Sequence, residues 1–152
     1  MIKTHRLAAC MLLVLGIFGT AQAAESAGMI KTSKGTVTLE RDGQKLIAVV
    51  GTPVLVADKL RTGSDGAVGV TLRDSTLLSA GPNSLITIDK FAFDSTTTDG
   101  RMSVGIRKGT LSVASGKIAK KTPESVDFHT PTSVLGVRGT EFVIEVGDGR
   151  ED

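Results

Sequence analysis

Apolar residues recur at every second position over short runs along the chain from residue 24 onward, and Gly, Asp and Ser separate these runs. In residues 141–146, Glu-Phe-Val-Ile-Glu-Val, both glutamates fall on one face and the other face is apolar. Residues 68–73 alternate in the same way, and no run keeps a helical period. The pattern predicts short β-strands with one face in a core and the other in water.

The dipeptide Asp42-Gly43 lies between two apolar runs, residues 36–40 and 46–50. A two-residue turn needs positive φ at both central positions, which Asp-Gly tolerates, so we expect a β-hairpin here. Further turn signals lie at Asp65-Gly66, Asp74-Ser75, Gly81-Pro82-Asn83, Asp99-Gly100, Lys108-Gly109 and Ser115-Gly116. Strands and turns at this spacing indicate one all-β domain, built as a β-sandwich or roll or as a short β-solenoid.

Two segments without the alternating pattern are expected to connect strands. Residues 95–98 form the most polar stretch and predict a loop tip, whereas residues 117–124 are rich in Lys and predict a mobile connection. A Gly between two apolar residues recurs in Val68-Gly69-Val70, Val104-Gly105-Ile106 and Leu135-Gly136-Val137. A Gly that faces inward or backs onto another strand lets two layers approach closely, so stacked coils stay open as an alternative.

Residues 1–23 have the composition of a secretory signal peptide. A short basic head is followed by a long apolar run and then by small residues. Because signal peptidase accepts small residues before the cut, Ala21, Ala23 and Ala24 mark the expected cleavage site. We expect the chain to be exported and to lose this leader. Residues 24–152 then form a periplasmic or secreted domain without a membrane span.

Removal of the leader changes the cysteine content and the charge. The one cysteine, Cys10, leaves with it, so residues 24–152 are expected to fold without a disulfide. Lys3 and Arg6 leave as well, which brings the formal net charge from +2 to zero. A neutral chain does not offer the basic surface that a nucleic acid needs. The chain has no Trp and no Tyr, so it has little aromatic surface for stacking on sugars or bases.

Side chains suited to catalysis are few. His129 has no partner beside it in the sequence, which favours a structural role over that of a general base. The chain has no Gly-x-Ser-x-Gly nucleophile elbow. Asp94, Asp99 and the acidic C-terminal residues do not follow the register of a calcium loop, which favours solvated turn carboxylates. We expect no enzymatic activity, no cofactor and no metal site.

An ordered series of short motifs spans residues 36–146. Its pieces are Gly51, Asp58-Lys59-Leu60, Thr62-Gly63, Gly66-Ala67, Leu72-Arg73-Asp74, Pro82-Asn83-Ser84, Gly109-Thr110-Leu111, His129-Thr130-Pro131 and Val137-Arg138-Gly139-Thr140-Glu141-Phe142. In this order they resemble the FecR-like domain family. The resemblance implies an exported all-β domain that binds or senses and does not catalyse.

The resemblance also implies a partner in the cell envelope. In the best-known members this domain lies in the periplasm and responds to an outer-membrane receptor for iron-siderophores. A membrane helix joins it there to a cytoplasmic segment that acts on a sigma factor. We expect this chain to lack that helix and that segment, so contact with a sigma factor is not carried over. The expected function is envelope signalling, linked to iron-transport regulation by resemblance, with another envelope protein as the partner.

Eight motif residues are expected to shape the fold. They are Gly63, Gly66, Gly109, Thr130, Pro131, Arg138, Gly139 and Thr140. Gly139 allows a bulge or a sharp bend. Arg138 either presents its guanidinium to a partner carboxylate or, in the interpretation we favour, pairs with a nearby Asp or a strand-end carbonyl. The sequence does not identify ligand-binding residues.

Two other functional classes stay open. The many Ser, Thr, Asn and Asp side chains could bind a cell-wall or carbohydrate ligand through hydrogen bonds. A structural or assembly protein of the envelope would follow if the C-terminal edge strand paired between copies. The sequence leaves the oligomeric state open.

Overall fold

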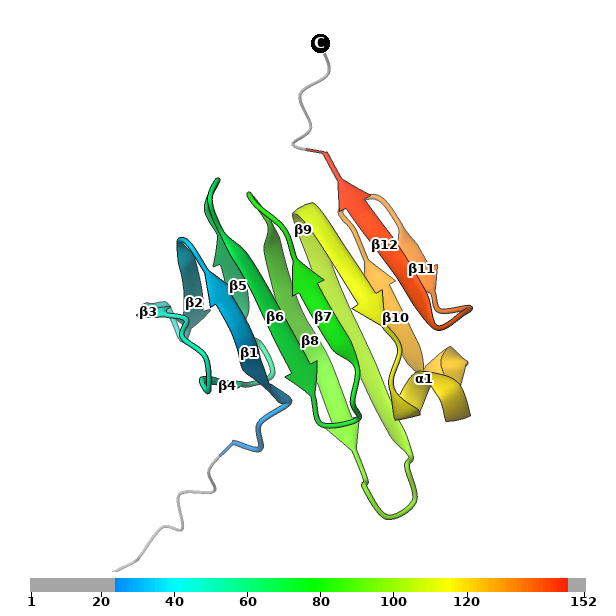
Figure 1. Cartoon of the computed structure of the whole chain (residues 1–152). Coiled ribbons are helices and arrows are strands. Elements are labelled where there is room, and N and C mark those ends of the chain that lie inside the picture. Colours follow the sequence, from blue (N-terminus) through cyan, green and yellow to red (C-terminus); the bar gives the residue numbers. More distant parts are fainter. Residues whose placement is uncertain (1–23, 148–152) are drawn as a thin grey trace, which may run out of the picture.

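The structure is a computed structural model that describes residues 24–147, and it confirms the all-β prediction (Figure 1). Across these residues the chain forms twelve strands, a short α-helix and a 3-10 turn. The strands are β1 (Gly28–Lys34), β2 (Val37–Arg41), β3 (Gln44–Ile47), β4 (Pro53–Val54), β5 (Lys59–Thr62), β6 (Ala67–Leu72), β7 (Leu77–Ala80), β8 (Leu85–Phe93), β9 (Gly100–Ala114), β10 (Val126–His129), β11 (Val134–Gly136) and β12 (Glu141–Val146). The helical elements are α1 (Lys117–Lys121) and η1 (Pro123–Ser125).

The long strand β9 belongs to both halves of a curled, mostly antiparallel sheet. Its residues 100–108 pair with β8, and on the other side β10 runs parallel to it. Its residues 109–114 pair with β7 and β12. One half therefore has the order β3-β2-β5-β8-β9-β10-β11, and the other has the order β4-β1-β6-β7-β9-β12. The two halves lie face to face as the layers of a sandwich (Figure 1).

The strand β9 changes halves at Gly109, where the sequence had predicted a turn. Gly109 has a φ of +88°, and a Cβ at this position would collide with Ser84. The Ser84 hydroxyl accepts the Thr110 amide at 3.0 Å, and the Ser84 amide donates to Thr62 Oγ1 at 2.8 Å. Ser84 and Thr62 are buried, so these hydrogen bonds fix the bend where the two halves of the sheet join.

A single apolar core fills the space between the two halves. The predicted alternation is confirmed in β6, where Val68, Val70 and Leu72 are buried and the residues between them are not. It is also confirmed in β12, whose Ile144 is buried and whose two glutamates are exposed. The largest fully buried side chains are Phe128, Ile30, Leu39, Leu72, Ile88, Met102, Ile106, Leu111 and Ile118.

The predicted hairpin is confirmed between β2 and β3. Asp42 and Gly43 have φ values of 51° and 76°, as a two-residue turn of this type requires. The second strand ends at Ile47, three residues before the predicted run ends, because residues 48–52 leave this half of the sheet.

The prediction of a mobile connection over residues 117–124 was wrong. This segment forms α1 and begins η1, and Ile118 is fully buried. The Ile118 amide donates to the buried carboxylate of Asp74 at 3.3 Å, and the Lys117 amide donates to the Asp74 carbonyl at 2.8 Å. A buried carboxylate thus anchors the start of the helix, which the lysine-rich local sequence does not show.

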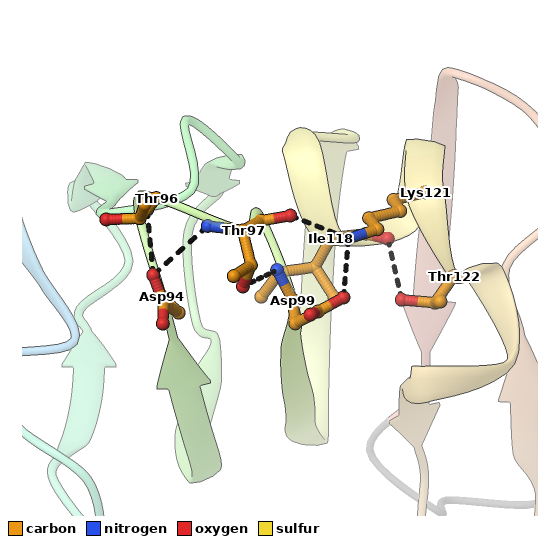
Figure 2. A network of polar contacts seen from close by, with 7 residues as sticks. All are labelled: Asp94, Thr96, Thr97, Asp99, Ile118, Lys121 and Thr122. Carbon is orange, nitrogen blue, oxygen red and sulfur yellow. Dashed lines mark hydrogen bonds and ion pairs between the residues drawn. The ribbon is translucent and has the colours of Figure 1, made fainter.

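The predicted loop tip is the connection between β8 and β9, and it is held against α1 (Figure 2). Asp94 Oδ1 accepts the amides of Thr96 and Thr97 at 2.7 and 3.2 Å. Lys121 Nζ lies 2.6 Å from both the Thr97 carbonyl and the Asp99 carboxylate, as Figure 2 shows. The hydrogen bond from Lys121 lowers the pKa of the Asp99 carboxyl.

The repeated Gly pattern does not mark stacked coils, and the solenoid alternative does not describe this fold. Gly69 and Gly105 alternate with buried apolar neighbours, so they lie on the outer faces of β6 and β9. A Cβ on Gly69 would collide with Thr32 of β1, and one on Gly105 would meet the side chains of Asp89 and His129. The glycines make room for side chains on the outside of the sheet, and not for a second layer inside.

Candidate functional site

The two ends of the sandwich differ. At the end formed by β3 and β4, residues 48–52 cross from one half of the sheet to the other, and we call this segment the strap. The Ala48 amide donates to the Val37 carbonyl at 3.1 Å, and the Gly51 amide donates to the Ile30 carbonyl at 2.8 Å. Ser33 Oγ donates to the Ala48 carbonyl at 2.7 Å, and Ala48 is buried. The strap therefore closes this end.

An ion pair supports the strap where it runs into β4. Arg41 contacts the buried carboxylate of Asp58 through two nitrogens, at 2.8 and 2.6 Å, and also donates to the Pro53 carbonyl at 2.9 Å. The Leu55 amide donates to the same carboxylate at 2.7 Å. The hydrogen bond to Asp58 raises the pKa of Arg41. Asp58, one of the FecR-like motif residues, thus acts in the architecture of the closed end.

The opposite end lies between the edge strands β11 and β12, and we call it the open end (Figure 1). The loop of residues 137–140 joins β11 to β12 here, but it does not fill the space between them. A groove of about 850 Å³ lies there. It is lined by Pro123, Glu124, Val126, Asp127, Phe128, Val134, Leu135, Gly136, Val137, Arg138, Phe142, Val143 and Ile144.

The floor of the groove is apolar and continuous with the core. The rings of Phe128 and Phe142 meet edge to face, with centroids 5.2 Å apart and planes at 82°. Leu135 pairs with Phe128 across β10 and β11, so both side chains point to the core side, yet Leu135 is 38% exposed. Beside the groove, Val134 and Val143 lie on the outer faces of β11 and β12 and are more exposed still, at 74% and 64%. Apolar surface of this kind, gathered at one place, marks a surface for interaction.

The backbone of β12 offers a second feature. Among the described strands, β12 pairs with β9 along one edge, and its other edge has no strand beside it. Such an edge carries amide and carbonyl groups that can pair with an added strand. Glu141 and Glu145 point outward on this strand and restrict which strands can approach.

Arg138 lies at the rim of the groove and is exposed. Within residues 24–147 its guanidinium forms neither an ion pair nor a hydrogen bond. The predicted pairing with a nearby Asp or a strand-end carbonyl is therefore not seen among these residues. Arg138 is carried by the loop between β11 and β12. Glu124 and Asp127 also line the groove, so its charged groups have both signs.

The loop that carries Arg138 bends at Gly139, whose φ is +115°. The Thr140 carbonyl accepts the Ser115 amide at 2.7 Å, and the Gly139 carbonyl accepts the Ser115 hydroxyl at 3.3 Å. A Cβ on Gly139 would meet nothing within 4 Å, so only its backbone conformation favours glycine.

Thr130 and Pro131 form the turn between β10 and β11. The Thr130 hydroxyl accepts the Ser133 amide at 3.1 Å, and the Thr130 amide donates to the Ser133 carbonyl at 2.8 Å. Thr130 and Pro131 line a smaller hollow beside Asp89, Gly105 and His129, and they are not part of the groove.

The remaining motif glycines, Gly63, Gly66 and Gly109, lie at a different place. The Gly66 amide donates to the Gly63 carbonyl at 3.0 Å, and the Gly63 amide donates to the Thr36 carbonyl at 2.9 Å. The Gly63 carbonyl also accepts the Asn83 amide at 3.0 Å, which links this turn to the bend at Gly109. The eight motif residues therefore do not form one site, and among them Arg138 alone lines the groove.

His129 has partners that its sequence neighbours do not reveal. Its Nε2 lies 2.8 Å from Asp89 Oδ2, and its Nδ1 lies 3.5 Å from both Asp127 Oδ2 and Ser103 Oγ. The Ser103 hydroxyl donates to Asp127 at 2.7 Å and is nearly buried, so His129 does not activate it as a nucleophile. The cluster ties β8, β9 and β10 together on their outer face, above Gly105.

Three further expectations concern a metal site, a membrane span and the cleavage of the leader. Among residues 24–147, no three His, Cys, Asp or Glu side chains converge as ligands of a metal ion. The helical segments of these residues are all too short to span a bilayer. Of the expected cleavage residues, Ala21 and Ala23 lie outside the described residues, and Ala24 is exposed and outside regular secondary structure.

The geometry defines an all-β sandwich domain with one closed end and one open, largely apolar end. A sequence model of the family described as FecR protein matches residues 58–151, which is more than half of the chain. The chain belongs to the FecR family, as its motifs predicted. The match begins in front of β5 and includes every residue that lines the groove. Neither the curated proteins nor the solved structures include a match.

Proposed function

We propose that this protein is an exported module of the cell envelope that binds another envelope protein and acts in signal sensing, without catalysing a reaction. The FecR family is a regulatory and signalling family, which supports a role of this class. The periplasmic or secreted location is supported by the composition of residues 1–23.

The open end is the observation that carries the proposal. It combines exposed apolar side chains such as Leu135 and Val143 with the free backbone edge of β12. An extended segment of a partner can hydrogen-bond to this edge while its side chains enter the groove. Full burial of a Leu or Val side chain contributes roughly 1.5–3 kcal/mol, so a few such contacts provide a useful binding energy.

Site-specific photo-crosslinking in cells tests the proposal. A photoreactive residue at Val143 is expected to crosslink an envelope protein, because this position is exposed at the rim of the groove. The matched control is the same residue at Lys31, which is exposed on β1 and separated from β12 by β6, β7 and β9. Combining the photoreactive residue at position 143 with Leu135→Asp should abolish the crosslink, because a carboxylate would enter the apolar groove.

Two results would refute the proposal. One is an identical crosslinking pattern at positions 31 and 143, which would show unspecific capture. The other is a crosslink at position 143 that persists unchanged with Leu135→Asp, since the groove would then take no part in binding.

A further inference from the structure

Apolar side chains are exposed at both ends of the sandwich, on the outermost strands of the sheet. Ile47 of β3 is 81% exposed, and Val49 and Val50 of the neighbouring strap are 56% and 61% exposed. Val143 of β12 is 64% exposed at the open end. Figure 1 shows β3 and β12 on opposite sides of the molecule, so one copy presents both edges at once.

The residues of β3 complement the last four residues of β12 when the strands are placed antiparallel. If Ile47 lies opposite Val143, then Lys45 faces Glu145 and Leu46 faces Ile144. Opposite charges and apolar pairs in these positions each stabilise a sheet, by about 0.2–1 kcal/mol per pair. The complementarity covers three of the four residues of β3, since Gln44 would face Val146.

The faces of the two strands also agree in this register. Leu46 pairs with the buried Leu39 inside its own hairpin, so it points to the core side, as Ile144 does on β12. Lys45 pairs with Glu40 on the outer face, which is where Glu145 also points. A one-residue shift would place core-side residues against outer ones, so the register is set by the pleat.

One symmetric pairing of β12 with a second β12 is disfavoured. In an antiparallel pair centred on Val143, Glu141 of each copy would face Glu145 of the other copy. Like charges directly opposite each other destabilise a sheet. The glutamates thus oppose this symmetric register, whereas Glu145 favours a strand that carries a lysine.

We propose that β3 of a second copy adds to the free edge of β12, so that the protein associates head to tail. This inference rests on the proposed function in one respect, namely that the open end accepts an added strand. Each copy in such a contact keeps one free β3 or β12 edge, so further copies can join and the assembly stays open-ended. An envelope partner that binds the open end would compete with the second copy for the same edge.

Charge reversal tests the proposal. The molar mass of the purified protein, measured by light scattering during size-exclusion chromatography, is expected to rise with concentration. Lys45→Glu or Glu145→Lys alone places like charges opposite each other and should raise the dissociation constant about fivefold to tenfold. An equimolar mixture of the two variants should associate again, and so should the double variant, because both restore an opposite-charge pair.

Lys31→Glu serves as the matched control, because it changes the net charge as Lys45→Glu does at an exposed site on β1, outside the two strands of the proposed contact. Circular dichroism must show that each variant is folded. Association that persists in both single variants would overturn the proposal, and so would a wild-type protein that stays monomeric at all concentrations. A monomeric protein that still crosslinks an envelope protein through Val143 would overturn this inference alone and leave the proposed function in place.

Discussion

Leu135 lies directly opposite Phe128 in the β10–β11 pair, and the two side chains point to the same side of the sheet. Phe128 is fully buried, whereas Leu135 is more than a third exposed. The difference arises because β10 lies between β9 and β11, while β11 is the last strand of its half and faces the groove. Of these two paired residues, Phe128 thus belongs to the core, and Leu135 belongs to a surface available for binding.

This relationship predicts effects of very different size for two substitutions. Phe128→Ala should lower the free energy of unfolding by about 3–5 kcal/mol, because it leaves a cavity in the core. Leu135→Asp should change it by about 1 kcal/mol or less, because the side chain is already partly in water. Urea denaturation measures both. A loss of several kcal/mol for Leu135→Asp would show that the groove belongs to the core and is not a free surface.

Gly109 and Gly139 both have positive φ, and they should respond differently to an added side chain. Gly139→Ala should cost about 1–3 kcal/mol, because its backbone conformation is unfavourable for other residues but no atom lies near the new Cβ. Gly109→Ala should cost more, since its Cβ would also overlap Ser84 inside the sheet bend. Denaturation midpoints of the two variants compare these costs, and equal midpoints would contradict the explanation.

Arg138→Ala should leave the midpoint nearly unchanged, because Arg138 is exposed.

Sequence alone was sufficient for features that depend on neighbouring residues. The alternation in β6 and β12 and the Asp42-Gly43 hairpin were predicted because strand pattern and turn type are local properties. The order of the FecR-like motifs also identified the family.

Features that depend on distant pairing were not predictable in this way. His129 meets Asp89 only because β10 joins β9 in parallel and β8 lies on the other side of β9. The first turn of α1 is anchored by Asp74, far away in the sequence. The open end depends on which strands remain without neighbours, and this is a property of the whole sheet.

The anchoring of α1 by Asp74 gives a third prediction. Asp74→Ala removes the acceptor of the Thr76 amide and hydroxyl and of the Ile118 amide, all of them buried. Each buried donor left without a partner costs about 1–3 kcal/mol, so unfolding should become easier by a few kcal/mol. Limited proteolysis should also cut within residues 117–121, which contain three lysines. Asp42→Ala is a suitable control for loss of a carboxylate at a turn, and no new cleavage is expected there. Unchanged protection of α1 in Asp74→Ala would contradict its role as an anchor.

The contact between the β8–β9 loop and α1 predicts how stability changes in acid. The hydrogen bond from Lys121 lowers the pKa of Asp99 in the folded protein, so Asp99 holds its proton less tightly when folded than when unfolded. Its contribution to stability is therefore fully present above the unfolded pKa, which is about 3.9, and is lost as the pH falls through the lower folded value. Asp99→Asn removes this titration. The difference in thermal midpoint between the wild type and Asp99→Asn should thus be largest near pH 6 and should shrink below about pH 4. Lys121→Met should reproduce this behaviour, because Asp99 then loses the partner that lowers its pKa. A difference in thermal midpoint that grows in acid would show that the contact does not favour the ionised carboxylate.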